Sequence, residues 1–222
     1  MVKLLYKILI TGIIQVETGL HIGGSDVELD IGGMDNEVIK VQIGNKKVPY
    51  IPGSSLKGKL RSLIARKMGY PDLNDDKGMV KKLFAGDLLK GNRSRNAKVP
   101  TRLIVRDAYV TGDFHLEDKA ENWIKRLSGT AVPRHMERVT KGACFELDMV
   151  LDIYEEDDAE ALLNTLNTCF QLLSYDYLGG SGSRGYGKVS FHDLKTGRLD
   201  FHEDGKLEKS GYSYAFNLMP QL

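Results

Sequence analysis

Leu178-Gly179-Gly180-Ser181-Gly182-Ser183-Arg184-Gly185-Tyr186-Gly187-Lys188 is the stretch of this 222-residue chain around which the other elements are arranged. Its glycines permit positive φ and let backbone N–H groups approach an anion without a Cβ in the way. Arg184 and Lys188 add cationic donors, and Tyr186 offers a ring on which a base could stack. These charged and aromatic residues favour a binding loop over a flexible glycine/serine linker.

Two phosphate-binding patterns overlap this stretch by their letters alone. Gly180-x-Gly182-x-x-Gly185 fits the dinucleotide fingerprint, and the residues from Gly182 to Lys188 nearly fit a P-loop, with Val189 in place of the Ser or Thr. Both motifs follow a strand and open a helix. This stretch instead follows a predicted helix and leads into a predicted strand, so we reject both interpretations.

Hydrophobic periodicity predicts two β-α-β units. The first unit consists of a strand over 3–16, a helix over 55–68 and a strand over 103–110. The second consists of a strand over 144–154, a helix over 157–173 and a strand from 188. Two such units predict an α+β fold, a ferredoxin-like or RRM-like palm with its helices on one face of the sheet.

The remaining segments are expected as insertions in a single domain spanning 1–222. Residues 69–101 form one loop-rich insertion, and the part over 85–101 fits no recognisable pattern. Apolar residues at helical spacing predict a further helix over 116–127, and the basic residues that follow, to about 142, predict a projecting loop or hairpin.

Charge is strongly segregated although the net charge is only +1. Residues 57–67 and 90–106 are basic and contain no acid, whereas acids gather around 148–160. Net charge therefore does not exclude a polyanionic partner, because binding depends on the local patch. Cys144 and Cys169 indicate buried, reduced thiols in a cytosolic protein, and we expect neither a signal peptide nor a membrane span.

Three further places carry candidate ligand-binding groups. His21 lies among glycines and could donate to a phosphate or sugar. Ser54 and Ser55 are expected to cap the helix over 55–68, where Lys57 and Lys59 oppose the macrodipole unless a phosphate binds there. The acids of 26–37 do not fit a calcium loop, and by residue type alone they are more typical of a solvated loop.

Four of these stretches, in order, resemble the RAMP superfamily, and within it the backbone subunits of type III-A CRISPR (Csm) effector complexes. They are Glu17-Thr18-Gly19-Leu20-His21-Ile22-Gly23-Gly24, Ile51-Pro52-Gly53-Ser54-Ser55-Leu56-Lys57-Gly58-Lys59, Pro133-Arg134-x-x-Glu137-Arg138-Val139 and the Gly-rich stretch. The resemblance extends over nearly the whole chain.

The resemblance implies a palm with a protruding thumb hairpin at about 116–142, and copies stacked along a CRISPR guide RNA with other Csm subunits. The guide-binding residues that it implies are His21, Ser54, Ser55, Lys57, Lys59, Gly180, Ser181, Gly182, Ser183, Arg184, Gly185, Tyr186 and Lys188, with Arg134 and Arg138 on the thumb. It also implies that Asp35 is required to cut the paired target RNA with a divalent metal, Mg²⁺, which makes Asp35 the candidate catalytic residue and metal ligand.

Three alternatives stay open from the sequence. The chain could be a guide-RNA scaffold without cutting activity, or a nuclease that processes the guide precursor with His21 as general acid or base. It could also be a metabolic ferredoxin-like domain that binds a small phosphorylated ligand. Metal dependence separates the two nucleases, and RNA affinity at low salt separates them from the metabolic domain.

Overall fold

The computed structural model describes residues 3–24, 37–85, 87–88, 98–202 and 205–218. Six elements make a ferredoxin-like core: β1 (Leu4–Val16), α1 (Gly53–Met68), β6 (Leu103–Val105), β10 (Cys144–Tyr154), α3 (Ala159–Ser174) and β11 (Val189–Phe201). Their strands are antiparallel and lie in the order β11-β1-β10-β6. The α+β palm predicted from the two β-α-β units is therefore confirmed.

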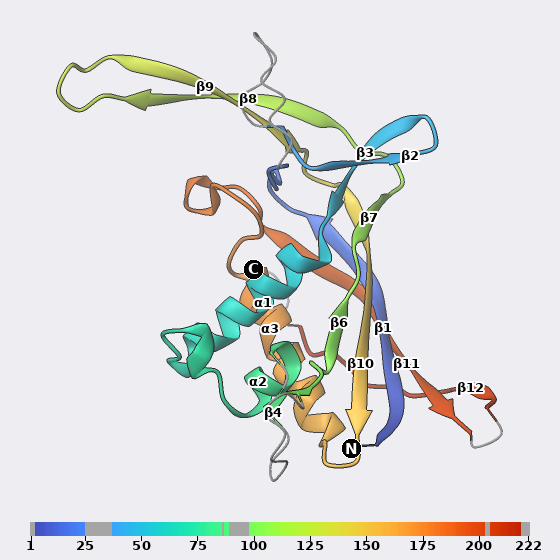
Figure 1. The fold of residues 1–222 in the computed structure, drawn as a ribbon. Coiled ribbons are helices and arrows are strands. Elements are labelled where there is room, and N and C mark those ends of the chain that lie inside the picture. The colour runs from blue at the N-terminus through green and yellow to red at the C-terminus, as the bar shows by residue number, and fades with distance from the viewer. Residues whose placement is uncertain (1–2, 25–36, 86, 89–97, 203–204, 219–222) are drawn as a thin grey trace.

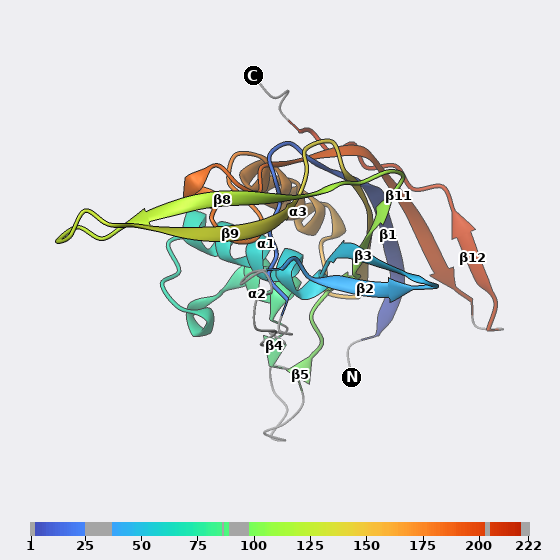
Figure 2. The same ribbon diagram turned by 90° about the horizontal axis from the view of Figure 1, so that it is seen from above.

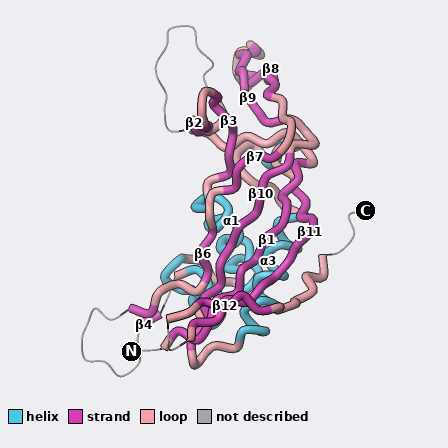
Figure 3. The backbone as a smooth tube through the Cα atoms, turned by 90° about the vertical axis from the view of Figure 1, so that its right-hand side faces the viewer, coloured by secondary structure: helices cyan, strands magenta, loops and turns pink. Residues whose placement is uncertain are grey.

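Both core helices cover the same face of the sheet (Figure 1, Figure 3). The inward side chains of β10 are Phe145, Leu147, Met149, Leu151 and Ile153, each no more than 1% exposed. They meet the apolar stripes of the helices, which include Leu56 and Leu60 of α1 and Leu162, Leu166 and Phe170 of α3. This burial is the main stabilising contribution, at about 25 cal/mol per Å² of apolar surface.

Further strands extend the sheet on both sides. β12 (Leu207–Ser210) adds to β11, while β7 (Ala108–Thr111) joins β10 to β3 (Lys46–Ile51) and β2 (Lys40–Ile43). β8 (Leu116–Ile124) and β9 (Ala131–Val139) pair with each other from Leu116↔Val139 to Ile124↔Ala131. This hairpin, hereafter the thumb, projects well beyond the palm (Figure 1, Figure 2).

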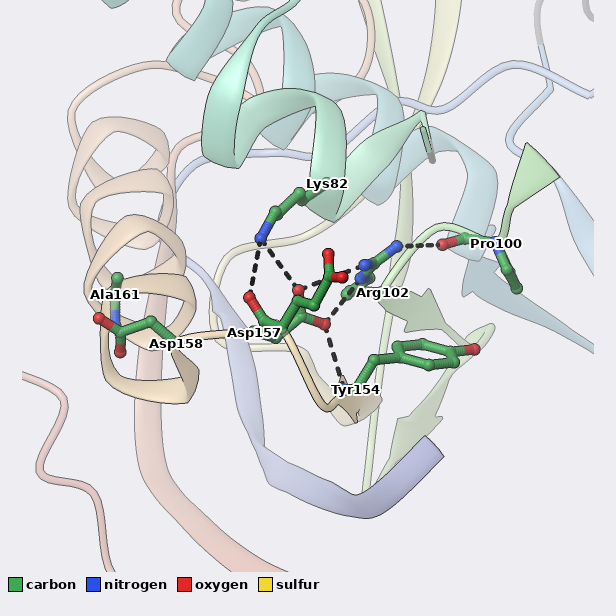
Figure 4. A network of polar contacts seen from close by, with 8 residues as sticks. Lys82, Pro100, Arg102, Tyr154, Asp157, Asp158 and Ala161 are labelled. Atoms are coloured by element: carbon green, nitrogen blue, oxygen red, sulfur yellow. Dashed lines mark hydrogen bonds and ion pairs between the residues drawn. The ribbon is translucent and has the colours of Figure 1, made fainter. Parts of the chain in front are cut away.

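The insertion after α1 contains η1 (Leu73–Asp75), α2 (Gly78–Phe84) and the short pair β4 (Asp87–Leu88) and β5 (Lys98–Val99). A buried ionic network ties it to the palm (Figure 4). Asp157, at the turn between β10 and α3, accepts hydrogen bonds from Arg102 Nε at 2.8 Å and from Lys82 Nζ of α2 at 3.1 Å. The side chain of Asp157 is completely buried and that of Arg102 is 5% exposed, so each charge depends on the other.

Three local predictions are wrong. Residues 116–127 are not helical, because the cross-strand partners in β9 outweigh a periodicity that arose by chance. Ser54 and Ser55 do not cap α1: the helix begins at Gly53, whose N–H is bound by the Asp107 carboxylate at 2.8 Å. The strand expected over 103–110 is interrupted at Arg106 and Asp107, which separate β6 from β7, and the Asp107 carboxylate at this break accepts the Gly53 N–H.

Cys144 and Cys169 are both free, in agreement with the expectation of reduced thiols. Cys169 is completely buried, and burial raises the pKa of its thiol to about 12, whereas Cys144 is only half-buried. In the described part of the chain, no α-helix combines the length and apolarity needed to span a lipid bilayer.

Candidate nucleic-acid interface

The sheet order brings three distant segments to one end of the palm. Val16, the last residue of β1, lies opposite Val189, the first of β11, and Gln15 lies opposite Cys144 at the start of β10. The segment after β1, the Gly-rich loop before β11 and the end of the thumb before β10 must therefore meet. Backbone hydrogen bonds join them: Leu20 and Val139 exchange two, and Gly180 N–H donates to the His21 carbonyl at 2.8 Å.

The Gly-rich loop depends on glycine at two closely packed positions. Gly179 has a φ of 77°, and a Cβ there would lie 2.2 Å from the His21 carbonyl oxygen. Gly187 has a φ of 73°, and a Cβ there would lie 2.0 Å from the Leu178 carbonyl oxygen. Only glycine fits where the backbone is left-handed and another backbone lies in contact. The loop is thus a compact turn with one short 3₁₀ segment, η2 (Gly182–Arg184), rather than a linker.

A hollow of about 520 Å³ opens beside this loop. It is lined by Thr18, Ser174, Tyr175, Asp176, Tyr177, Gly182, Gly185, Tyr186 and Lys188. Tyr175 and Tyr177 are exposed there, and the Lys59 ammonium lies 3.6 Å from the centre of the Tyr177 ring. Tyr175 is therefore suitable for stacking a base, and the sequence analysis missed it because it precedes the glycines. The ring of Tyr177 is already covered by Lys59 and by Gly182, where an added Cβ would lie 1.9 Å from the ring.

Tyr186, in contrast, cannot stack on a base in this structure. Only 1% of it is exposed, and its hydroxyl donates to Glu121 Oε1 of the thumb at 2.8 Å. Burial, together with that carboxylate, raises the pKa of Tyr186 to about 12. Lys119 and Arg138 lie over its ring at 4.5 and 4.9 Å from the centre. The expectation of a stacking platform is therefore wrong, and Tyr186 instead fastens the Gly-rich loop to the thumb.

His21 is placed between the Gly-rich loop and the thumb. Its ring is 6% exposed, and Nδ1 donates to the backbone carbonyl of Glu137 at 2.7 Å. The Glu137 carboxylate in turn accepts hydrogen bonds from the N–H of Val38 at 2.9 Å and from Lys40 Nζ at 3.0 Å. Burial is the largest single influence on the pKa of Lys40 and lowers it, but the carboxylates of Glu137 and Glu37 together raise the pKa overall.

Asp35 and the other acids of 26–35 lie outside the described residues. Val38, three positions after Asp35, is held on Glu137 of the thumb, so the described chain resumes beside the His21 segment. The described residues contain no group of three or more His, Cys, Asp or Glu side chains arranged to hold a metal ion. The assignment of Asp35 as catalytic residue and metal ligand therefore stays a prediction.

The start of α1 only partly meets the loop. Lys59 Nζ pairs with Asp176 Oδ1 at 2.8 Å, at the entrance of the Gly-rich loop. Lys57 Nζ points elsewhere and donates to the Leu103 carbonyl at 2.6 Å and to Thr101 Oγ1 at 3.1 Å. Burial lowers the pKa of Lys57, as expected for an ammonium enclosed in the protein. A phosphate held by both lysines at this helix start is therefore excluded in this structure.

The arginines differ in how available they are. Arg134 is exposed on β9, opposite Glu121 in the strand register. Arg138 is half-buried, with Nε 2.5 Å from Glu117 Oε1, and Arg184 is 63% exposed, with Nη1 3.6 Å from Glu121 Oε2. The partners Glu117 and Glu121 were missed. They alternate with Lys119 along β8, a pattern that a strand assignment would have placed on one face.

Of the other residues predicted to bind RNA, Gly182, Gly185 and Lys188 line the same hollow. Ser183 and Gly185 are exposed, and Ser181, Gly182 and Lys188 are half-buried. Ser54 is exposed and Ser55 half-buried in the first turn of α1. The palm end thus presents glycine backbone, hydroxyl groups, tyrosine rings and cations together, which is the combination suited to a ribose–phosphate strand.

The chain is similar in sequence to known proteins. A curated relative, the CRISPR system Cms endoribonuclease Csm3 of Methanocaldococcus jannaschii, is 45% identical over 204 residues, covering 85% of this chain and 80% of the relative. The protein of the same description from Streptococcus thermophilus is 39% identical, with 86% of this chain and 89% of the relative covered.

Solved structures agree. A Csm3–Csm4 subcomplex of the type III-A CRISPR-Cas interference complex matches with a TM-score of 0.58 and 34% identity, covering 94% of this chain and 89% of that one. A type III-B Cmr-beta complex bound to cognate target RNA has the same TM-score at 19% identity, which supports the fold alone. Since the RAMP superfamily model also matches residues 13–190, this chain belongs to the RAMP superfamily, among the relatives described as Csm3.

Proposed function

We propose that this chain is the repeating backbone subunit of a cytoplasmic type III-A CRISPR ribonucleoprotein. It binds the guide RNA and cuts the paired target RNA at regular intervals. Its partners are the guide, the target, other Csm subunits and further copies of itself. The relatives described as Csm3 endoribonucleases, and the solved structure of one with Csm4, support this proposal.

One observation carries the RNA-binding part. The Gly-rich loop, the His21 segment and the base of the thumb come from separate parts of the chain and form one continuous hydrogen-bonded end of the palm. Backbone N–H groups in a left-handed loop and nearby guanidinium groups suit phosphates, and the exposed ring of Tyr175 suits a base. A small phosphorylated metabolite needs fewer contacts than this extended surface provides.

Target cutting is assigned to Asp35. In the proposed reaction a ribose 2′-oxygen bonds to the adjacent phosphorus while the bond to the 5′-oxygen breaks, leaving a cyclic phosphate and a 5′-hydroxyl. The Asp35 carboxylate orients the 2′-hydroxyl and takes its proton, while a water molecule protonates the leaving 5′-oxygen. Alternatively, Asp35 would hold a Mg²⁺ ion, which would supply charge stabilisation to the phosphate while water takes up the proton of the 2′-hydroxyl. The thumb displaces one nucleotide of each interval, which provides the in-line geometry that a regular duplex lacks.

The test uses the assembled complex with a labelled complementary target. Asp35→Ala should abolish cutting at every interval while the complex keeps its guide RNA, because one carboxylate is lost from the chemistry but none from the palm end. Asp26→Ala, in the same acidic segment, is the matched control and should cut normally. Full cutting by Asp35→Ala would make the chain a scaffold, and the catalytic assignment would fall.

Metal dependence is tested in the same assay. Chelation by EDTA should stop target cutting, and Mg²⁺ should restore it. Cutting of a guide precursor that survives EDTA and is lost in His21→Ala would instead identify the processing nuclease. The buried position of His21 and its bond to the Glu137 carbonyl instead favour a structural role, in which the ring holds the segment after β1 against the thumb.

A further inference from the structure

The cations at the RNA-binding end of the palm are paired with carboxylates of the protein itself. Arg138 Nε lies 2.5 Å from Glu117, and Lys119 Nζ lies 3.1 Å from Glu121. Arg184 of the Gly-rich loop lies 3.6 Å from the other oxygen of Glu121. In the described structure, then, acids of the thumb hold positions next to cations that a phosphate would use.

These pairs are arranged so that a phosphate can replace them. Arg184 is 63% exposed, and Arg138 and Glu117 are 20% and 42% exposed. Ion pairs with such exposure contribute only about 0–1 kcal/mol each, so exchanging the carboxylate for a phosphate costs little. The buried pair of Arg102 and Asp157 is different, because no solvent reaches it to exchange the partner.

Glu121 also has a structural bond that fixes its place. It accepts the Tyr186 hydroxyl at 2.8 Å, and that bond is the main cause of the lowered pKa of its carboxyl. Because Tyr186 is buried under the thumb, the carboxylate is held beside Arg184 rather than free to turn into solvent. A negative charge is therefore built into the rim of the Gly-rich loop.

We propose that Glu117 and Glu121 are internal counter-ions that compete with RNA for Arg138, Lys119 and Arg184. This inference rests on the proposed function. The acids lower the affinity for RNA that reaches only one or two of these cations, while a guide that engages the whole palm end displaces them together. They thus act as specificity-determining residues against random cellular RNA.

The test measures binding of a mixed-sequence single-stranded RNA to the purified full chain over a series of KCl concentrations. Glu121→Gln keeps an oxygen for the Tyr186 hydroxyl but removes the charge, so the fold is preserved. It should bind this RNA up to about fivefold more tightly, as expected when cations lose a competing partner worth up to about 1 kcal/mol. The slope of log affinity against log salt should steepen by about 0.7 for each added phosphate contact.

Two controls separate the possible outcomes. Asp118→Asn removes the same charge from the same hairpin, but Asp118 pairs with His135 at 2.7 Å rather than with one of these three cations. The RNA affinity of this variant should therefore stay at the wild-type value apart from a small general charge effect. Glu117→Gln is an independent variant that should also bind the RNA more tightly than wild type, as Glu121→Gln should. Wild-type affinity in both Gln variants, while Arg184→Ala weakens binding, would overturn the counter-ion proposal alone. Absence of RNA binding in wild type and every variant would overturn the proposed function as well.

Discussion

Gly187→Ala tests whether the close packing of the Gly-rich loop is essential to the palm end. Gly187 has a φ of 73°, and an added Cβ would lie 2.0 Å from the Leu178 carbonyl oxygen, well inside the 3.0 Å below which real Cβ contacts essentially never occur. The same two residues are bonded through Leu178 N–H and the Gly187 carbonyl at 2.8 Å. The alanine methyl group therefore forces two backbone strands of the loop apart.

Gly185→Ala is the matched control, because it isolates the cost of the backbone conformation. Gly185 has a φ of 87° with no atom within 4 Å of an added Cβ. A left-handed alanine costs about 1 kcal/mol at either position. At Gly187 the separation adds a lost backbone hydrogen bond and disturbed packing, for a total of about 3 kcal/mol. For a chain of this length, that corresponds to a fall in Tm of about 6–12 °C for Gly187→Ala and about 2–4 °C for Gly185→Ala.

The assay is thermal and urea unfolding of the purified chain, followed by RNA binding below the Tm of the variants. Gly187→Ala should also weaken RNA binding, because the shifted loop no longer bonds Gly19 and the His21 segment. If the free energy of unfolding fell by the same amount in both alanine variants, the close approach of Gly187 to Leu178 would contribute nothing to stability. That result would refute the proposed role of close packing in the loop.

Two other predictions concern charges. Lys57→Met should lower the free energy of unfolding by about 1–3 kcal/mol, because the bonds to Leu103 and Thr101 are lost, and should leave the salt slope of RNA binding unchanged. Arg134→Ala should reduce that slope without loss of stability. The reverse pattern in RNA titrations and urea melts would contradict the assigned orientations of the two side chains. Asp157→Ala should cost about 3–5 kcal/mol, because Arg102 keeps a buried charge without its partner. Burial raises the pKa of Asp157, but its hydrogen bonds, chiefly to Arg102 and Lys82, together outweigh this effect and leave the pKa below the ordinary 3.8. The stabilisation is therefore present above about pH 4 and is lost as pH falls through the folded-state pKa. If Asp157→Ala left the acid unfolding curve of the wild type unchanged, this role would be excluded.

The sequence pattern alone predicted those helices and strands in which buried residues recur at regular spacing. The strand at 144–154 and the helix expected over 157–173 match β10 and α3 closely, because one face of each packs on the core. The thumb strand β8 was not predictable in this way. Trp123 and Ile124 of β8 are 59% and 61% exposed, so the spacing of the apolar residues in this strand does not correspond to a buried face. The pairing of β8 with β9 is a property of the tertiary structure.

Side-chain partners were the other limit, since a residue type does not reveal where its charge is satisfied. Lys57 and Lys59 stand two positions apart in one helix, yet Lys57 is enclosed by Leu103 and Thr101 while Lys59 reaches Asp176. Tyr186 has the composition of a stacking residue and is instead buried against Glu121. Both outcomes depend on contacts more than forty residues apart in the chain, which no local pattern encodes.

The convergence of the binding segments follows from topology. In a ferredoxin-like sheet the first strand lies between the third and the fourth and pairs antiparallel with each of them. The end of β1 must then lie beside the starts of β10 and β11, whatever residues follow. Once two β-α-β units are assigned, the segment after Val16, the loop before Val189 and the chain leading into Cys144 are placed at one end of the palm. What topology leaves open is the charge placed there, and acids such as Glu117 and Glu121 decide how strongly that end attracts RNA before the guide arrives.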